Sequence, residues 1–171
     1  MLSARLVKMI EDHAEHLTKG VLEQFHTHPL MIAYRKFSDR ELHARVYDVY
    51  HNLGRWIDEK ADDAVAATYS QLGRTRRGEN IPLAQVVMAL TLTKYHLRDY
   101  VRDCGLVGSA VELYQEQELH RLVERFFDSC IYHTVRGYEE DGWKGETAAE
   151  EPVTAGASSR GRGSRRFLTR R

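Results

Sequence analysis

The 171-residue chain has few features that would brace it covalently or anchor it in a membrane. Its two cysteines, Cys104 and Cys130, form no CxxC pair, which excludes a disulfide framework and a four-thiolate zinc site. It has only three prolines, and no apolar run approaches the roughly 20 residues that span a bilayer. Glu11 and Asp12 interrupt the start before a signal-peptide core is complete, so we expect a cytoplasmic protein.

The usual signatures of catalysis and of nucleotide binding are missing too. No serine lies in a GxSxG elbow, and neither cysteine has a base beside it in the sequence. The segment from Gly73 to Gly78 has the wrong glycine spacing for a nucleotide-binding loop. Its arginines, Arg74, Arg76 and Arg77, either grip an anion or lie exposed at a helix end, where they stabilise the helix dipole, and we favour the second interpretation. We therefore predict a protein that is not an enzyme.

Zero net charge conceals an uneven distribution of charge. Six of the 25 basic residues follow Ala155, which leaves 19 basic against 25 acidic residues before that point, a net charge of −6. The tail that carries these six has almost nothing to bury, so we expect 141–171 to be a disordered linker and tail. The tail either shields the acidic body or binds nucleic acid or an anionic membrane surface. Its basic residues are Arg160, Arg162, Arg165, Arg166, Arg170 and Arg171.

The rest of the chain has helical periodicity. Apolar residues recur at steps of three and four, and no alternating strand pattern occurs. His28-Pro29 ends the first segment, a Ser38–Glu41 capping box opens the second, and Pro82 suits the first turn of the fourth. We predict an all-α domain over 1–140, with about five helices packed as a bundle or in a globin-like way. The expected helices span roughly 3–27, 38–57, 60–77, 82–104 and 109–137.

The fifth of these segments has an apolar stripe of double width. One side of such a stripe can pack in the core while the other packs against a second subunit, so we expect a homodimer. The residues that we assign to this interaction surface are Leu119, Leu122, Val123, Phe126, Phe127 and Ile131.

Nine histidines raise the question of a metal or a cofactor. A di-iron bundle needs two Glu-x-x-His units, and the chain has one, at Glu23 and His26, so we predict no metal site. Haem needs a single axial histidine in an apolar pocket. His13, His51 and His96 are the candidate ligands for haem or another cofactor, and the alternative for each is a hydrogen-bonded structural role.

One segment resembles a known family. Leu72-Gly-x-x-Arg76 is followed by Gly78, by Ile81-Pro82-Leu83 and by an apolar helix through Leu92. This pattern, with the apolar helix before it, resembles the RsbRD-type N-terminal domain, an input domain of bacterial stressosome regulators. The resemblance covers the whole of the predicted helical body.

The resemblance implies an all-helical sensory or regulatory domain that is dimeric and has no catalytic residues. Stressosome input domains related to it are globin-like and lack haem. Family members usually precede an output domain, whereas only a linker and the basic tail follow here. We therefore predict a standalone signal-transduction module that binds itself and a signalling protein, and that shifts between two helical packings. The alternatives are a haem- or cofactor-based gas or redox sensor, and binding of nucleic acid or an anionic surface through the tail.

Overall fold

A computed structural model describes residues 2–104 and 108–146, and the side chains of 4–58, 60–104 and 108–140. Within these ranges the chain forms seven α-helices and two short 3-10 helices, and no β-strand. The predicted all-α class is confirmed, while the predicted tail arginines, Arg160 to Arg171, lie outside the described residues. The helices are α1 Leu2–Asp12, α2 Ala14–Thr27, η1 Ile32–Lys36, α3 Asp39–His51, α4 Leu53–Trp56, η2 Glu59–Ala61, α5 Asp62–Gly78, α6 Leu83–Asp103 and α7 Ala110–Glu146.

The number of helices exceeds the prediction because two predicted helices are each divided. The first breaks between α1 and α2 at His13, where φ is −105° and ψ is 13°, and where Nδ1 lies 2.8 Å from the Met9 carbonyl oxygen. The second breaks between α3 and α4 at Asn52, whose Nδ2 donates to Asp48 Oδ1 at 2.8 Å. At Asn52 φ is −114° and ψ is 27°, so the backbone departs from helical geometry at both residues.

Apart from the end of α7, the other predicted boundaries are found close to where the sequence placed them. At the start of α3, Ser38 donates from its backbone N and its Oγ to Glu41 Oε2, at 2.9 and 2.7 Å, as expected for a capping box. The α5 helix ends at Gly78, and Asn80 then adopts a left-handed φ of 56°, which asparagine tolerates better than most residues. Pro82 directly precedes α6.

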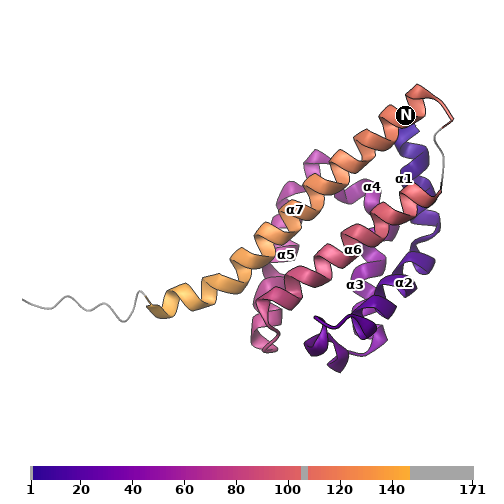
Figure 1. The fold of residues 1–171 in the computed structure, drawn as a ribbon. Coiled ribbons are helices and arrows are strands. Elements are labelled where there is room, and N and C mark those ends of the chain that lie inside the picture. The colour runs from indigo at the N-terminus through magenta and orange to yellow at the C-terminus, as the bar shows by residue number, and fades with distance from the viewer. Residues whose placement is uncertain (1, 105–107, 147–171) are drawn as a thin grey trace, which may run out of the picture.

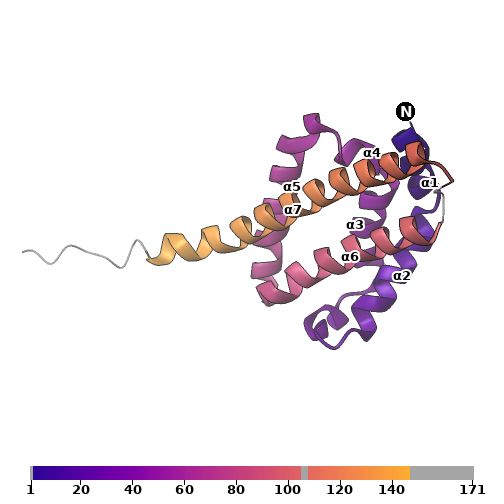
Figure 2. The same ribbon diagram turned by 45° about the horizontal axis from the view of Figure 1, so that its top comes forward.

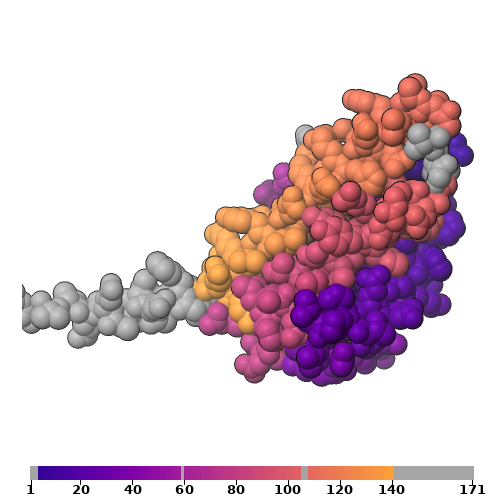
Figure 3. Space-filling view, viewed as in Figure 1, coloured from indigo at the N-terminus to yellow at the C-terminus, as the bar shows by residue number. Residues whose placement is uncertain are grey.

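The long helix α7 forms one wall of the molecule (Figure 1). Its most extensive contact is with α5, and it also packs against α6 and α1, while α2 packs against α3. In the space-filling view α6 and α7 lie side by side (Figure 3). The last turns of α7 extend past the other helices (Figures 1 and 2), so the helix continues from Gly137, its predicted end, to Glu146. Arg136 donates to Glu140 at 2.9 Å, a pairing one turn apart that favours this extension.

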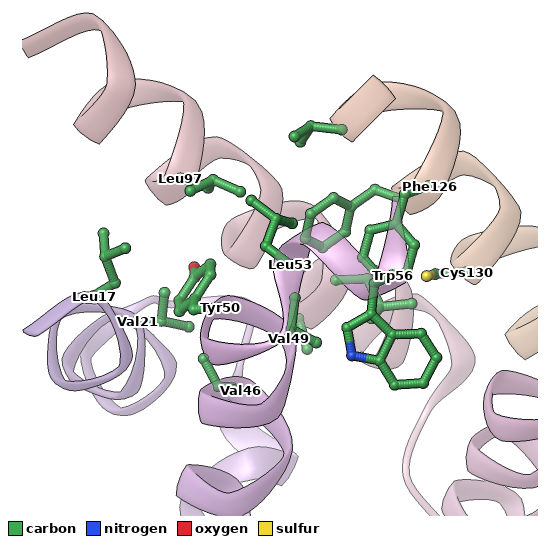
Figure 4. Close-up of a cluster of buried hydrophobic side chains, with 14 of the residues drawn as sticks. Leu17, Val21, Val46, Val49, Tyr50, Leu53, Trp56, Leu97, Phe126 and Cys130 are labelled. Atoms are coloured by element: carbon green, nitrogen blue, oxygen red, sulfur yellow. The ribbon is translucent and has the colours of Figure 1, made fainter. Parts of the chain in front are cut away.

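A single hydrophobic core joins α1, α2, α3, α5, α6 and α7. Leu17 of α2 and Tyr50 of α3 are completely buried in it, and Tyr50 donates from its hydroxyl to the Thr93 carbonyl oxygen at 2.8 Å (Figure 4). On the other side of the same core, Trp56 and Phe126 lie with their ring centres 6.1 Å apart. Buried side chains from these six helices therefore belong to one core.

The core also takes up most of the surface that we assigned to a dimer. Both sides of the wide stripe on α7 are covered by the same chain, because α5 and α6 flank it. Four of the six residues are buried in the chain's own core and two are partly buried against it, and their part in a dimer contact stays a prediction. Leu119, Val123, Phe126 and Phe127 are buried, and Leu122 and Ile131 are partly buried against the core.

Candidate functional site

A half-open cavity of about 420 Å³ lies between α3, α5 and α6. The space exists because α3 and α5 pack mainly against other helices rather than against each other. The main partner of α3 is α2, and that of α5 is α7. Small-molecule sites in proteins are typically clefts of roughly 300–1,000 Å³. The cavity is therefore large enough to hold a ligand.

The cavity has an apolar interior and a polar mouth. Residues that line it and are also exposed mark the place where it meets solvent, and these come from α3 and α5. Its deeper lining is buried and consists mainly of hydrocarbon side chains. The mouth residues are Glu41, Ala44, Arg45 and Thr68, and the buried apolar lining includes Phe25, Leu42, Val86, Ala89, Leu90 and Phe127.

Arg76 of α5 lines the cavity, and its side chain is only 5% exposed. Its Nη1 donates to Glu79 Oε2 at 2.6 Å, and its guanidinium carbon lies 4.1 Å from the centre of the Phe37 ring. Its Nε is buried without a hydrogen-bond partner among the described atoms. Such an unpaired buried donor costs about 1–3 kcal/mol, so the site retains one strong donor that nothing satisfies.

Arg45 of α3 is the second cation that lines the cavity. No hydrogen bond or ion pair joins its side chain to another residue in the part of the chain that the structure describes. Partial burial, and after it the charge of the neighbouring Arg76, lower the pKa of Arg45. The charge of Glu79, which pairs with Arg76, acts in the opposite direction on the pKa of Arg45.

The carboxylates beside Arg45 already have donors of their own. Glu41 lies four residues before Arg45, a spacing that often gives an ion pair in a helix. Here its carboxylate instead accepts both hydrogen bonds from Ser38, which lower the pKa of Glu41. Asp48 accepts from Trp56 Nε1 at 3.1 Å. Arg45 therefore has no direct hydrogen bond to either carboxylate, although both lie on the same cavity.

The opposite face of α5 is held tightly against α7. A Cβ atom added at Gly73 would meet the carbonyl oxygen of Thr134, and one added at Gly137 would meet the carbonyl oxygen of Ser70. The two backbones approach so closely that only glycine, which lacks a Cβ, fits at these positions. The Leu72-Gly-x-x-Arg76 motif thus supplies one residue to the helix crossing and another to the cavity.

Of the three arginines near the end of α5, Arg76 does not act as the sequence suggested. Arg74 Nη2 donates to Glu140 Oε2 of α7 at 2.8 Å, and Arg77 Nη1 donates to the Tyr138 carbonyl oxygen at 2.9 Å. Arg76 is buried. An exposed role for Arg76 in stabilising the helix dipole is therefore wrong, because the aromatic residues that follow α2 cover that side of the helix.

The predicted cofactor ligands are not among the residues that line this cavity. His13 is exposed at the break between α1 and α2, and His51 is exposed at the end of α3, with Nδ1 3.3 Å from the Tyr47 hydroxyl. His96 is half-buried on α6 and lies 3.2 Å from Gln24 Nε2, and burial lowers the pKa of His96. Haem binding stays a prediction, and the geometry of the cavity does not favour it.

The described residues include one buried thiol, that of Cys130. Cys130 is completely buried, and burial raises the pKa of its thiol, which suits packing rather than nucleophilic attack. No group of three His, Cys, Asp or Glu side chains in the described ranges is placed to hold a metal ion. Nor is any helix in those ranges both long enough and apolar enough to cross a membrane.

Sequence reasoning named Arg76 but did not place Arg45 at a site. Arg45 lies beside the stripe formed by Leu42, Val46 and Val49, where a charged residue usually marks a solvated helix edge. Its role depends on α5 standing away from α3, and no local pattern carries that information.

No protein-family model matches the chain, and no curated protein or solved structure shows significant similarity to it. The resemblance of the Leu72–Leu92 segment to the RsbRD type therefore stays a prediction. What the structure adds is a physical use for two parts of that segment, the helix crossing at Gly73 and the cavity wall at Arg76.

Proposed function

We propose that this chain is a non-enzymatic regulatory domain that reports the state of its cavity to a protein partner through α7. The resemblance to RsbRD-type input domains supports the proposal, and the globin-like packing and the dimer implied by that resemblance form part of it. The observation that carries it is the position of α5, which lines the cavity with one face and packs against α7 with the other, while Phe127 of α7 also reaches the cavity.

Thr68, Leu72 and Arg76 of α5 line the cavity, while Ser70 and Gly73 touch α7. At the crossing point no side chain lies between α5 and α7, because the two backbones are in direct contact there. Packed interfaces of this kind change between discrete arrangements rather than deforming continuously. A ligand that prefers one position of α5 therefore shifts the population of the matching position of α7.

The exposed apolar residues indicate where α7 meets a partner. Of the seven large hydrophobic side chains exposed in the described part of the chain, four lie on α7. Three of them are clustered near its start. The four are Val111, Leu113, Tyr114 and Tyr132, with exposed fractions of 59%, 45%, 69% and 61%.

The first test is the oligomeric state. Light scattering at tens of micromolar should show a dimer, and Tyr114→Glu should shift it toward monomer because the change places a charge in an apolar contact. The matched control is Gln117→Glu, which adds the same charge at an exposed position of the same helix without removing apolar area. A strict monomer for the unmodified chain would remove self-association from the proposal.

A further inference from the structure

The interior of the cavity suits an aliphatic chain. Its buried lining is hydrocarbon, and the polar groups of Thr93 are already used: its hydroxyl donates to the Ala89 carbonyl oxygen at 2.8 Å, and its carbonyl accepts from Tyr50. Most of the buried surface that a ligand would meet in this space is therefore hydrocarbon. Apolar burial would therefore drive binding.

The mouth selects for a negative charge. Arg45 makes no hydrogen bond or ion pair among the described residues, and Glu41, one turn before it, bonds to Ser38 instead. A guanidinium group presents its N–H donors in a planar fork that matches the two oxygens of a carboxylate. The reverse orientation would bury a carboxylate beside Phe25 and Phe127, which is strongly unfavourable.

We propose that the cavity binds a single-chain aliphatic carboxylate, a fatty acid, with its chain between α3, α5 and α6 and its head group on Arg45. This deepens the proposed function: the regulatory consequence rests on that function, but binding itself does not.

Calorimetric titration of the full chain, freed of lipid by extraction, tests the proposal. The probes are dodecanoate, dodecanol and dodecylammonium, each below its micellar concentration, because they share a tail and differ only in head group. Dodecanoate should bind about tenfold or more tightly than dodecanol, as expected for charge-assisted hydrogen bonds to an arginine. Dodecylammonium should bind more weakly than both.

Variants at the mouth separate the head group from the tail. Arg45→Gln should weaken dodecanoate about tenfold or more and leave dodecanol unchanged, and Arg45→Lys should restore part of the loss. Arg40→Gln is the matched control, since Arg40 is exposed on α3 but does not line the cavity. Thr68→Trp, at an exposed position of the mouth, should block both ligands without disturbing the core.

Equal weakening by Arg45→Gln and Arg40→Gln would overturn the assignment of the head group. Absence of dodecanoate binding, or binding that Thr68→Trp leaves intact, would overturn the site itself. Light scattering on the same samples keeps the two proposals apart. A monomer that binds dodecanoate at Arg45 supports the site and contradicts self-association. A dimer that binds none of the three amphiphiles supports self-association and contradicts the site.

Discussion

Gly73 and Gly137 show how single residues determine the approach of two helices. In the sequence each is a glycine inside or near the end of a helical pattern, where glycine usually only weakens the helix. The structure places both at the crossing of α5 and α7, where the backbone of the opposite helix occupies the space of a Cβ atom. The two lie in helices far apart in the chain, so no local pattern could pair them.

Gly73→Ala and Gly137→Ala should each lower the free energy of unfolding by about 1–3 kcal/mol, the usual cost of overpacking. The sign of this change in the free energy of unfolding is informative, because alanine stabilises a helix by about 1 kcal/mol over glycine where there is room for the Cβ atom. Gly78→Ala is the control: a Cβ atom there meets nothing within 4 Å, so its stability should equal or slightly exceed that of the parent. Urea unfolding followed by circular dichroism measures all three, and equal stability of the Gly73 and Gly78 variants would refute the close crossing.

Arg76 and Arg45 mark the limit of sequence reasoning at the candidate site. An arginine near a helix end is most often exposed, and the pattern around Arg76 gives no sign that aromatic residues following α2 lie over it. The sequence did not single out Arg45, because Glu41 would be its expected ion-pair partner. In the structure Glu41 accepts hydrogen bonds from Ser38 instead. Chemistry that arises from the competition of several side chains for one another is visible only in three dimensions.

Among the helices, the α5–α7 pair is joined by charge as well as by backbone contact. Glu140 of α7 accepts from Arg74 of α5 and from Arg136 of its own helix, at 2.8 and 2.9 Å. The hydrogen bond from Arg74, with a further contribution from Arg136, lowers the pKa of Glu140 below its ordinary 4.5. A carboxyl group with a lowered pKa in the folded state stabilises that state only when it is ionised.

The stabilisation by Glu140 should be complete above about pH 4.5, its ordinary pKa, and should be lost as the pH falls through the lower pKa of the folded protein. Glu140→Gln should therefore be less stable than the parent at neutral pH, and the difference should shrink in acid. Chemical unfolding at a series of pH values measures this. Glu139→Gln removes a carboxylate from an exposed neighbouring position and serves as control. A difference that does not change with pH would show that the ion pair contributes nothing.

The helices also show which parts of the fold the sequence specifies. Signals that depend on local chemistry, such as the capping box at Ser38 and the stop at Gly78, were predicted correctly. The breaks at His13 and Asn52 were missed because the apolar periodicity continues through them. A change of helix direction alters which neighbours a stripe meets without altering its spacing. The helical segments were therefore predictable from the sequence, whereas the way in which the helices pack was not.

For the molecule as a whole, one continuous core implies one cooperative unit. Buried side chains from the first helix to the last belong to the same cluster, and α7, the last helix, packs against α1, the first. A domain of this size with one core usually unfolds in a single step. The cavity does not divide the core, because Phe127 and Val86 line the cavity and also belong to the cluster.

Leu17→Ala in α2 and Leu119→Ala in α7 should each lower the stability of the entire molecule by about 2–5 kcal/mol, the usual cost of emptying a fully buried leucine site. In a Trp143→Phe background, fluorescence reports Trp56 alone, while circular dichroism reports all helices. Both signals should shift together in both variants, because neither helix can lose its packing without exposing the other. Leu113→Ala, at a position of α7 that is 45% exposed, should change stability by less than about 0.5 kcal/mol. If Leu17→Ala moved the circular dichroism transition and left the Trp56 signal in place, the helices would form two units, and a ligand between α3 and α5 would have no rigid path to α7.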